Sequence, residues 1–329
     1  MAFALRVKKV LAMALAASAG AGALAQDIPT IRVGWTIPAE EAKYWMMRRP
    51  DAFPELGKSY RIEWTQFQGT APMVQAMLSN ALDCSSQAPL SLGQGVINGQ
   101  LKAYVIAQHA GESPSSFSVY WGVREADPIK RPEDLKGKTV GVNVYGSGVH
   151  GQMAMILKNS GLDPAKDVQL VETGFPGSEA ALRGGRVDAA VFVQPFAARA
   201  EAKGGIRKLF SLQQLMPNTV HVIEVCKADF ADSHPDLVRH YVRDLTRAMQ
   251  MAMARREETI AVVSEVTRAP VEALAGYLMT PSDFARSADM RPDTQAIQAM
   301  LDQYAELGML SRRLDAGTLV RPDLMAPLQ

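Results

Sequence analysis

The sequence predicts an α/β protein of two lobes, each a mainly parallel sheet flanked by helices. Short apolar segments with the two-residue period of a strand alternate with longer segments that have the period of a helix. Alternation of this kind favours parallel sheets covered by helices. The chain has 329 residues, 47% of them hydrophobic and 21% charged, so it can form two units with complete cores.

The first 25 residues have the pattern of a secretory signal peptide. Basic residues at positions 6, 8 and 9 precede an apolar run at 10–23, and Ala23-Leu24-Ala25 matches a small-residue cleavage site. The apolar run is shorter than the roughly 20 residues that a membrane-spanning helix needs. We therefore expect cleavage after Ala25 and a mature protein in the periplasm.

The charge of the remaining chain excludes some partners. Residues 1–25 contain three basic and no acidic residues, which leaves 32 basic and 34 acidic residues after cleavage. No basic stripe is present, so a nucleic acid is not expected as a partner. The histidines show no close metal-ligand spacing, and we expect neither a metal nor a cofactor.

The strands can be assigned in order along the chain. Tyr60, Ile62 and Trp64 alternate on one face, and 187–193 is a nearly continuous apolar run typical of a strand buried on both faces. We expect strands at 31–35, 60–67, 101–108, 117–123, 139–144, 168–172, 187–193, 206–210 and 219–226.

The helices follow from the longer period. Pro72 falls in the first turn of one helix, and Val149, Met153 and Ile156 lie on one face of another. Ser178 is expected to cap a third, and a short segment at 83–86 leads to a helix near Pro89. The remaining helices are expected at 70–82, 147–160, 178–183, 195–203, 235–256 and 294–309.

The connection at 110–116 suggests a crossover between lobes. We therefore expect one lobe made from both ends of the chain, 26–116 and 224–329, and a second lobe, 117–223, inserted into it.

Candidate ligand-binding residues follow predicted strands or precede predicted helices. In open α/β sheets, ligands bind beyond the carboxyl ends of strands, where free N–H groups at helix starts suit an anion. Small residues let the backbone approach a ligand, hydroxyls donate hydrogen bonds, and aromatic rings form walls. The candidates are Trp35, Thr36, Gln68, Gly69, Thr70, Ser85, Ser86, Gln87, Ser147, Gly148, Val149, Phe175 and Phe196.

One motif favours a different function. Gly146, Gly148 and Gly151 fit the dinucleotide-binding pattern between a strand and a helix, and Glu172 stands where the ribose-binding acid is expected. Export to the periplasm argues against a nicotinamide cofactor. A dinucleotide-binding oxidoreductase nevertheless remains the alternative from a different class.

The histidines and cysteines leave several roles open. His109, His150 and His221 are each compatible with a ligand contact or with a structural role. An oxidising compartment permits a disulfide between Cys84 and Cys226. Because they lie far apart in sequence, we expect two buried small apolar residues instead.

Six segments together resemble the periplasmic binding proteins for aliphatic sulfonates, taurine and nitrate. They are IRVGW at 31–35, EWTQFQGT at 63–70, ALD at 81–83, PIKRPEDLKGKTVGV at 128–142, LRGGRVDA at 182–189 and QPF at 194–196. The resemblance implies the type II periplasmic binding protein fold, with the ligand in a cleft between the lobes. It adds Gln194 to the candidate ligand residues. Two departures stand out: Asn80 replaces a glycine common in relatives, and the loop at 85–87 is shorter than in sulfonate binders.

The resemblance and the residues lead to one functional expectation. We expect a non-enzymatic solute-binding protein, a monomer, that delivers a small organic anion to an ABC permease and its ATPase. The anion would be a sulfonate, a taurine-like or nitrate-like anion, or an aromatic carboxylate. Alternatives are an enzyme of the same fold class, similar to those of thiamine pyrimidine synthesis, and the ectodomain of a sensor.

Overall fold

The structure is a computed structural model that describes residues 28–325. The signal peptide expected at residues 1–25 lies outside the described residues. Within the described range, no helix combines the length and apolar character needed to cross a membrane.

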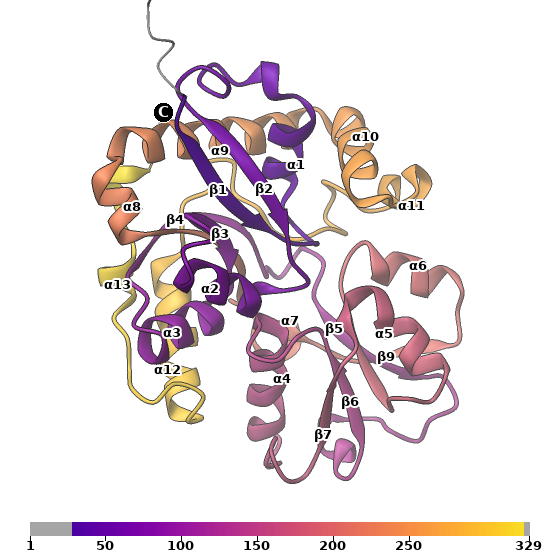
Figure 1. The fold of residues 1–329 in the computed structure, drawn as a ribbon. Helices are drawn as coiled ribbons and strands as arrows, with labels where there is room; N and C mark the ends of the chain where they lie inside the picture. Colours follow the sequence, from indigo (N-terminus) through magenta and orange to yellow (C-terminus); the bar gives the residue numbers. More distant parts are fainter. Residues whose placement is uncertain (1–27, 326–329) are drawn as a thin grey trace, which may run out of the picture.

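Two five-stranded sheets form the centres of two lobes (Figure 1). The first sheet has the order β2-β1-β3-β10-β4 and the second has the order β7-β6-β8-β5-β9. The strands of the first are β1 (Thr30–Trp35), β2 (Arg61–Gln66), β3 (Cys84–Gln87), β4 (Ala103–Gly111) and β10 (Val220–Lys227). Those of the second are β5 (Tyr120–Arg124), β6 (Thr139–Val142), β7 (Gln169–Glu172), β8 (Ala189–Phe192) and β9 (Ile206–Ser211).

Helices flank both sheets. Those of the first lobe are α1 (Glu41–Arg48), α2 (Thr70–Leu78), α3 (Pro89–Asn98), α8 (Ala228–Ser233), α9 (Pro235–Ala254), α10 (Arg256–Thr267), α11 (Val271–Ala275), α12 (Thr294–Glu306) and α13 (Ala316–Leu319). Those of the second are α4 (Gly148–Asn159), α5 (Gly174–Arg183), α6 (Phe196–Ala202) and α7 (Leu212–Leu215). Short 3-10 turns lie at Pro50–Ala52, Pro132–Leu135 and Pro322–Leu324.

Each sheet combines parallel and antiparallel pairs, and one strand of each sheet is parallel to both of its neighbours. β1 runs parallel to β2 and β3, and β6 runs parallel to β7 and β8. By contrast, β10 and β5 are antiparallel to both of their neighbours. These two strands follow the crossings between lobes, so they enter their sheets from the opposite direction. Because β10 starts at Val220, the expected boundary at 223/224 falls inside a strand of the first sheet, and the division into domains stays a prediction.

Several helix bounds differ from the sequence expectation. α1 was not predicted, because its eight residues include the charged Glu41, Lys43 and Arg48, although Ala42, Trp45 and Met46 are buried on one face. α5 begins at Gly174, so Ser178 is inside the helix and its hydroxyl donates to the carbonyl of Gly174 at 3.1 Å instead of capping. The single helix expected at 235–256 ends at Ala254, and α10 follows it.

The lobes share an apolar core on one side of the molecule. α4 of the second lobe packs against α3 and α12 of the first. One continuous cluster of buried side chains therefore includes Leu90, Val149, Met153, Leu301 and Tyr304. A second cluster fills the space between the first sheet, α1 and α9.

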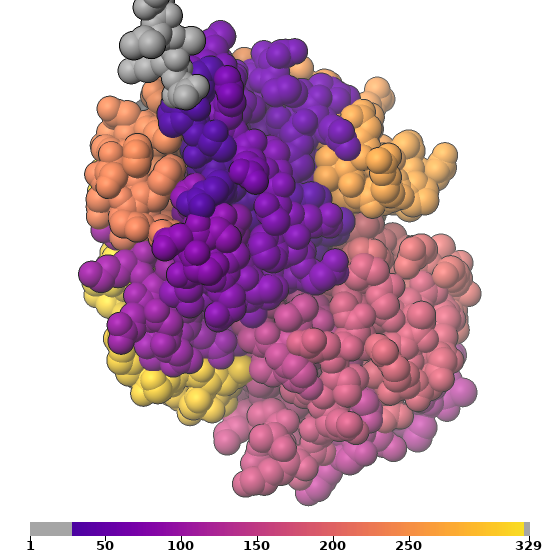
Figure 2. All heavy atoms as spheres, viewed as in Figure 1, coloured from indigo at the N-terminus to yellow at the C-terminus, as the bar shows by residue number. Residues whose placement is uncertain are grey.

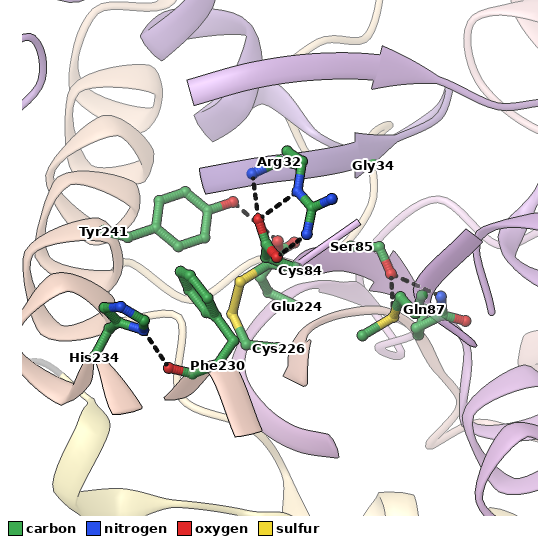
Figure 3. Close-up of a disulfide and its surroundings, with 12 residues drawn as sticks. Arg32, Gly34, Cys84, Ser85, Gln87, Glu224, Cys226, Phe230, His234 and Tyr241 are labelled. Atoms are coloured by element: carbon green, nitrogen blue, oxygen red, sulfur yellow. Dashed lines mark hydrogen bonds and ion pairs between the residues drawn. A yellow bond between two sulfur atoms is a disulfide. The ribbon is translucent and has the colours of Figure 1, made fainter. Parts of the chain in front are cut away.

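A disulfide joins Cys84 to Cys226, so the expectation of two unbridged cysteines was wrong (Figure 3). β3 and β10 are neighbours in the first sheet, and the two residues face each other with Cα atoms 4.0 Å apart. Sheet pairing across 142 residues of sequence brings them together, which no local pattern reveals.

Candidate functional site

A cavity lies between the lobes, where loops from both sheets meet. It has a volume of about 510 Å³, counted with its opening to solvent. Its walls contain the loop before α1, the start of α2, the start of α4, Val119 in the segment that leads into β5, and the beginning of β10. The lining residues are Thr36, Pro38, Ala39, Gly69, Thr70, Ala88, Val119, Asn143, Ser147, Gly148, Val149, Gln152, Phe175, Val193, His221, Val222 and Phe284.

The first turns of two helices, one from each lobe, reach this cavity. Thr70 begins α2, and Ser147 is the residue before α4. The Ser147 hydroxyl accepts a hydrogen bond from the backbone N–H of Ala71 at 3.2 Å, so the two helix starts touch each other. Free N–H groups at such ends carry partial positive charge. The cavity is therefore suited to a negatively charged group.

Acidic residues distinguish one nearby helix from the others. α1 has Glu41 in its first turn, and Glu40 before it accepts the N–H of Thr36 at 3.1 Å. The helices α2, α3, α4 and α5 have no acidic residue in the first turn. Glu40 and Glu41 are paired with Lys43 and Arg286, so the starts of α2 and α4 are the helix ends that would attract an anion in the cavity.

Three buried polar atoms in the wall have no hydrogen-bond partner among the described residues. They are Thr70 Oγ1, Asn143 Oδ1 and Gln152 Oε1. Buried polar atoms are nearly always paired, so each one needs a reason. Their position in the cavity wall supplies that reason, since a ligand between the lobes would be within reach of them. A hydroxyl donates to an anion, whereas the amide oxygens accept from a ligand N–H or O–H.

A histidine forms part of the wall. His221 Nε2 lies 2.9 Å from Glu112 Oε1, and that oxygen also accepts the N–H of Val119 at 3.1 Å. His221 Nδ1 lies 3.4 Å from Gln152 Nε2, and its ring meets Phe284 edge-on with centroids 5.5 Å apart. His221 is the one ionisable side chain of the cavity wall within the described residues. This group of contacts joins the beginning of β10 to the segment that runs from β4 to β5.

The remaining wall is apolar. It includes Val119 just before β5, Val193 just after β8, and Val222 near the beginning of β10. Phe175 and Phe284 add aromatic rings from the two lobes. Within the described residues no lysine or arginine lines it. The site thus combines hydrogen-bond donors for an anion with a hydrophobic surface for an organic group.

Half of the predicted site residues line the cavity. These are Thr36, Gly69, Thr70, Ser147, Gly148, Val149 and Phe175. The residues that sequence reasoning did not select include Asn143 and Gln152, whose amides give no local signal. His221 had been singled out without an assigned role.

The other predicted residues lie elsewhere. Trp35 is buried against Tyr44, with ring centroids 5.8 Å apart, and Gln68 is exposed. Gln194 accepts the N–H of Ala198 at 3.2 Å, and Phe196 lines a separate groove. These side chains follow strand ends as predicted, but the turn directs them away from the cavity.

The loop at 85–87 is also buried outside the cavity wall. Ser85 contacts the sulfur of Met77 at 3.1 Å and accepts from Gln87 at 2.8 Å (Figure 3). Gln87 in turn accepts from Ser91 at 2.8 Å. These residues form strand β3, so their side chains are used inside the first lobe.

Ser86 belongs to a buried cluster of charged residues behind the cavity. Its hydroxyl accepts from Lys43 Nζ at 2.5 Å. Lys43 also pairs with Glu224 at 2.7 Å and Glu40 at 3.3 Å, and His109 lies 3.0 Å from Glu224. All these side chains are fully buried. Through Glu40 the cluster holds the Thr36 loop, so His109 has a structural role here.

The two carboxylates of this cluster respond differently to their surroundings. Burial raises the pKa of Glu40, and the nearby Lys43 and His109 only partly oppose it. Burial alone would also raise the pKa of Glu224, but Lys43 and His109 outweigh it and lower that pKa. Glu224 therefore stays ionised as the partner of Lys43.

The glycine motif forms a contact between lobes, so the dinucleotide interpretation was wrong. A Cβ on Gly148 would lie 3.0 Å from Ala88 Cβ, and one on Gly151 would lie 2.5 Å from Leu90 Cδ2 and 2.8 Å from Tyr304 Cε1. Gly146 has a φ of +75° and faces Gln94 and Ala71. These glycines let α4 approach the first lobe, so their small size is explained by packing between the lobes.

Two other features of the motif have structural explanations. Glu172 accepts the N–H of Tyr145 at 2.7 Å, so it is not placed toward a ribose. His150 Nδ1 accepts the N–H of Gly146 at 3.1 Å, and burial lowers the pKa of His150 although Glu172 acts in the opposite sense. The neutral ring thus completes the turn before α4. Within residues 28–325 no group of three or more His, Cys, Asp or Glu side chains is placed to hold a metal.

The two lobes and the cavity between them define the class of periplasmic binding proteins, whose fold this chain shares. Residues 25–267 match the model of the NMT1-like family, and the chain belongs to this family.

The proteins that it resembles are named as binding proteins. The chain is 24% identical over 269 residues to the putative aliphatic sulfonates-binding protein of Escherichia coli K12, covering 82% of this chain and 81% of the relative. It is 25% identical over 229 residues to the taurine-binding periplasmic protein of the same organism, covering 66% and 67%. The alkanesulfonate-binding protein SsuA from Xanthomonas axonopodis pv. citri, bound to MOPS, superposes with a TM-score of 0.72 at 19% identity, covering 89% of this chain and 98% of that one.

Proposed function

We propose that this protein is a periplasmic solute-binding protein that captures a small organic anion and delivers it to an ABC permease and ATPase. The observation that carries the proposal is the meeting of α2 and α4, both without acidic residues in the first turn, at one cavity between the lobes. Names of relatives that bind sulfonates and taurine support the same class of ligand.

The walls narrow the choice of ligand. Helix starts and the Thr70 and Ser147 hydroxyls would hold the anionic group, and Phe175 and Phe284 would cover the organic part. Because no lysine or arginine of the described residues lines the cavity, a singly charged anion such as a sulfonate or carboxylate fits better than a dianion. Polar groups of the ligand would form hydrogen bonds with Asn143, Gln152 and His221.

The protein would act by binding without catalysis. His221 is already engaged by Glu112, and the Ser147 hydroxyl of the same wall is hydrogen-bonded to the backbone N–H of Ala71 and not to His221. We propose that the ligand is released unchanged to the importer, and that the exported protein is a monomer.

Calorimetry on the chain without residues 1–25 tests this function. Taurine, an alkanesulfonate, nitrate and an aromatic carboxylate form the panel, with a neutral amide as the control. We expect saturable binding of at least one anion with one site per chain, and none of the amide. If no anion binds, or if the neutral compound binds equally well, the proposal is wrong.

A further inference from the structure

A second hollow lies between the lobes on the side opposite to their shared core. It is lined by α6 of the second lobe and by the end of α10 and α11 of the first. Figure 1 shows α6 facing α11 across the boundary between the lobes, and Figure 2 shows the surface indented there. We name this hollow the outer groove. Its volume is about 1180 Å³, counted with its opening to solvent.

The same two chain segments lie between the outer groove and the inner cavity. In the loop before α1, Ile37 lines the groove, whereas its neighbours Thr36 and Pro38 line the cavity. In the segment after β8, Pro195 and Phe196 line the groove, whereas Val193 lines the cavity. Two chain segments, one from each lobe, thus separate the spaces by a single layer of residues. α4 packs against α3 and α12 on the other side of the cleft, so the groove lies on the side that this contact leaves uncovered.

The charge of the groove differs from that of the cavity. Arg199, Lys203 and Arg268 line the groove, and Glu272 is its acidic residue. Arg199 and Lys203 are about half exposed and both reach Glu179, at 3.7 and 3.0 Å, which also pairs with Arg183. The groove lining has three basic side chains and one acidic one, and when Glu179 and its partner Arg183 are also counted, four basic side chains stand against two acidic ones. The cavity has no cationic lysine or arginine among its described residues.

We propose that the outer groove is the entrance through which the organic anion reaches the inner cavity, and that its cations accelerate capture. This inference rests on the proposed function. Exposed cations at the mouth of a cleft raise the local concentration of an anion and its association rate. Because they do not touch the bound anion, they leave its dissociation rate unchanged. The cavity then binds through helix starts and hydroxyls alone.

Stopped-flow binding of an alkanesulfonate to the Lys203→Gln/Arg268→Gln variant tests the groove. Arg268 follows α10 in an exposed turn, and Glu179 keeps Arg183 and Arg199 when Lys203 is replaced. We expect the association rate to fall about fourfold at low ionic strength, with an unchanged dissociation rate. In about 0.5 M salt the difference should disappear, because the Debye length is then short.

The matched control removes the same charge far from the groove. Lys58 and Lys130 are exposed and do not line the groove, so Lys58→Gln/Lys130→Gln should bind at the rate of the unmodified protein. An equal loss of rate in both double variants would overturn the proposal, as would a loss that appears in the dissociation rate.

A second measurement does not need any ligand to bind in the cavity. Small anionic and neutral nitroxides broaden amide signals according to their local concentration. We expect the anionic nitroxide to broaden the amide signals of α6 and α11 more strongly than the neutral one does. This difference in broadening should be lost in Lys203→Gln/Arg268→Gln. Equal broadening by both nitroxides would refute the entrance. If calorimetry detects binding of none of the anions, the proposed function is refuted instead.

Discussion

Thr70 presents a buried hydroxyl to the inner cavity without a hydrogen-bond partner among the described residues. Thr70→Val keeps the shape and removes this donor. We expect the affinity for the organic anion to fall about tenfold or more, since a hydrogen bond to a charged group is worth about 1.5–3 kcal/mol. The free energy of unfolding should not fall, because the unpaired buried polar atom is removed as well. Calorimetry and urea unfolding measure the two quantities.

Thr246→Val is the matched control for this change. Thr246 is buried in α9, and its hydroxyl donates to the carbonyl of Val242 at 2.9 Å. This variant should lose some stability and bind the anion normally. Unchanged affinity in Thr70→Val would show that the hydroxyl does not contact the ligand.

His150 makes stability depend on pH. Burial lowers its pKa in the folded protein, with Glu172 acting in the opposite sense. The folded state therefore binds fewer protons than the unfolded state between the lowered pKa and the ordinary value of about 6.5. The stabilisation is complete above about pH 6.5 and decreases as the pH falls through that window. His150→Gln should remove this dependence, which amounts to at most about 1.4 kcal/mol per pH unit.

Urea unfolding at several values between about pH 7 and pH 5 measures this effect. His234→Gln serves as the control, because His234 is exposed at the start of α9. The control should keep the slope of the unmodified protein. If the free energy of unfolding of His150→Gln still depends on pH in this range, the dependence arises from another group.

At the scale of elements, α4 is the contact through which the lobes meet. A Cβ on Gly151 would lie 2.5 Å from Leu90 and 2.8 Å from the Tyr304 ring, both in the first lobe. Gly151→Ala should therefore push the lobes apart, weaken anion binding and reduce stability by about 1–3 kcal/mol. Small-angle scattering should report a larger radius of gyration.

Gly177→Ala is the matched control within the same lobe. Gly177 lies in α5, and a Cβ there would meet nothing within 4 Å. This variant should keep its radius and affinity, and its stability should rise by up to about 1 kcal/mol. If Gly151→Ala behaves like Gly177→Ala, the close contact between lobes does not control the cleft.

At the scale of the whole molecule, the disulfide joins segments that lie on either side of the second lobe in sequence. It links β3 to β10 across 142 residues. Replacing both cysteines, as Cys84→Ala/Cys226→Ala, should lower the free energy of unfolding by about 2–5 kcal/mol, mainly because the unfolded chain gains freedom. Anion affinity should change little, since neither cysteine lines the cavity. Urea unfolding checks the first result, and equal stability of the two proteins would contradict it.

The sequence predicted some of the site because its loops carry local signals. Gly69, Thr70, Ser147 and Gly148 combine small size with hydroxyls at helix starts, and all line the cavity. Asn143, Gln152 and Phe284 line it too, but amides and aromatic rings are equally common in cores and on surfaces. Ser85 to Gln87 carried the same local signal as the other loops, yet they form a buried strand.

The sequence by itself determined the alternation of strands and helices, since periodicity is a property of neighbouring residues. It also determined the family, through segments that lie mostly in the first two thirds of the chain. Only the tertiary structure decided the bridge between Cys84 and Cys226, the approach of α4 through Gly151, and the pairing of His221 with Glu112. These contacts join residues that are 61 to 153 positions apart, and distance along the chain carries no information about which side chains will meet.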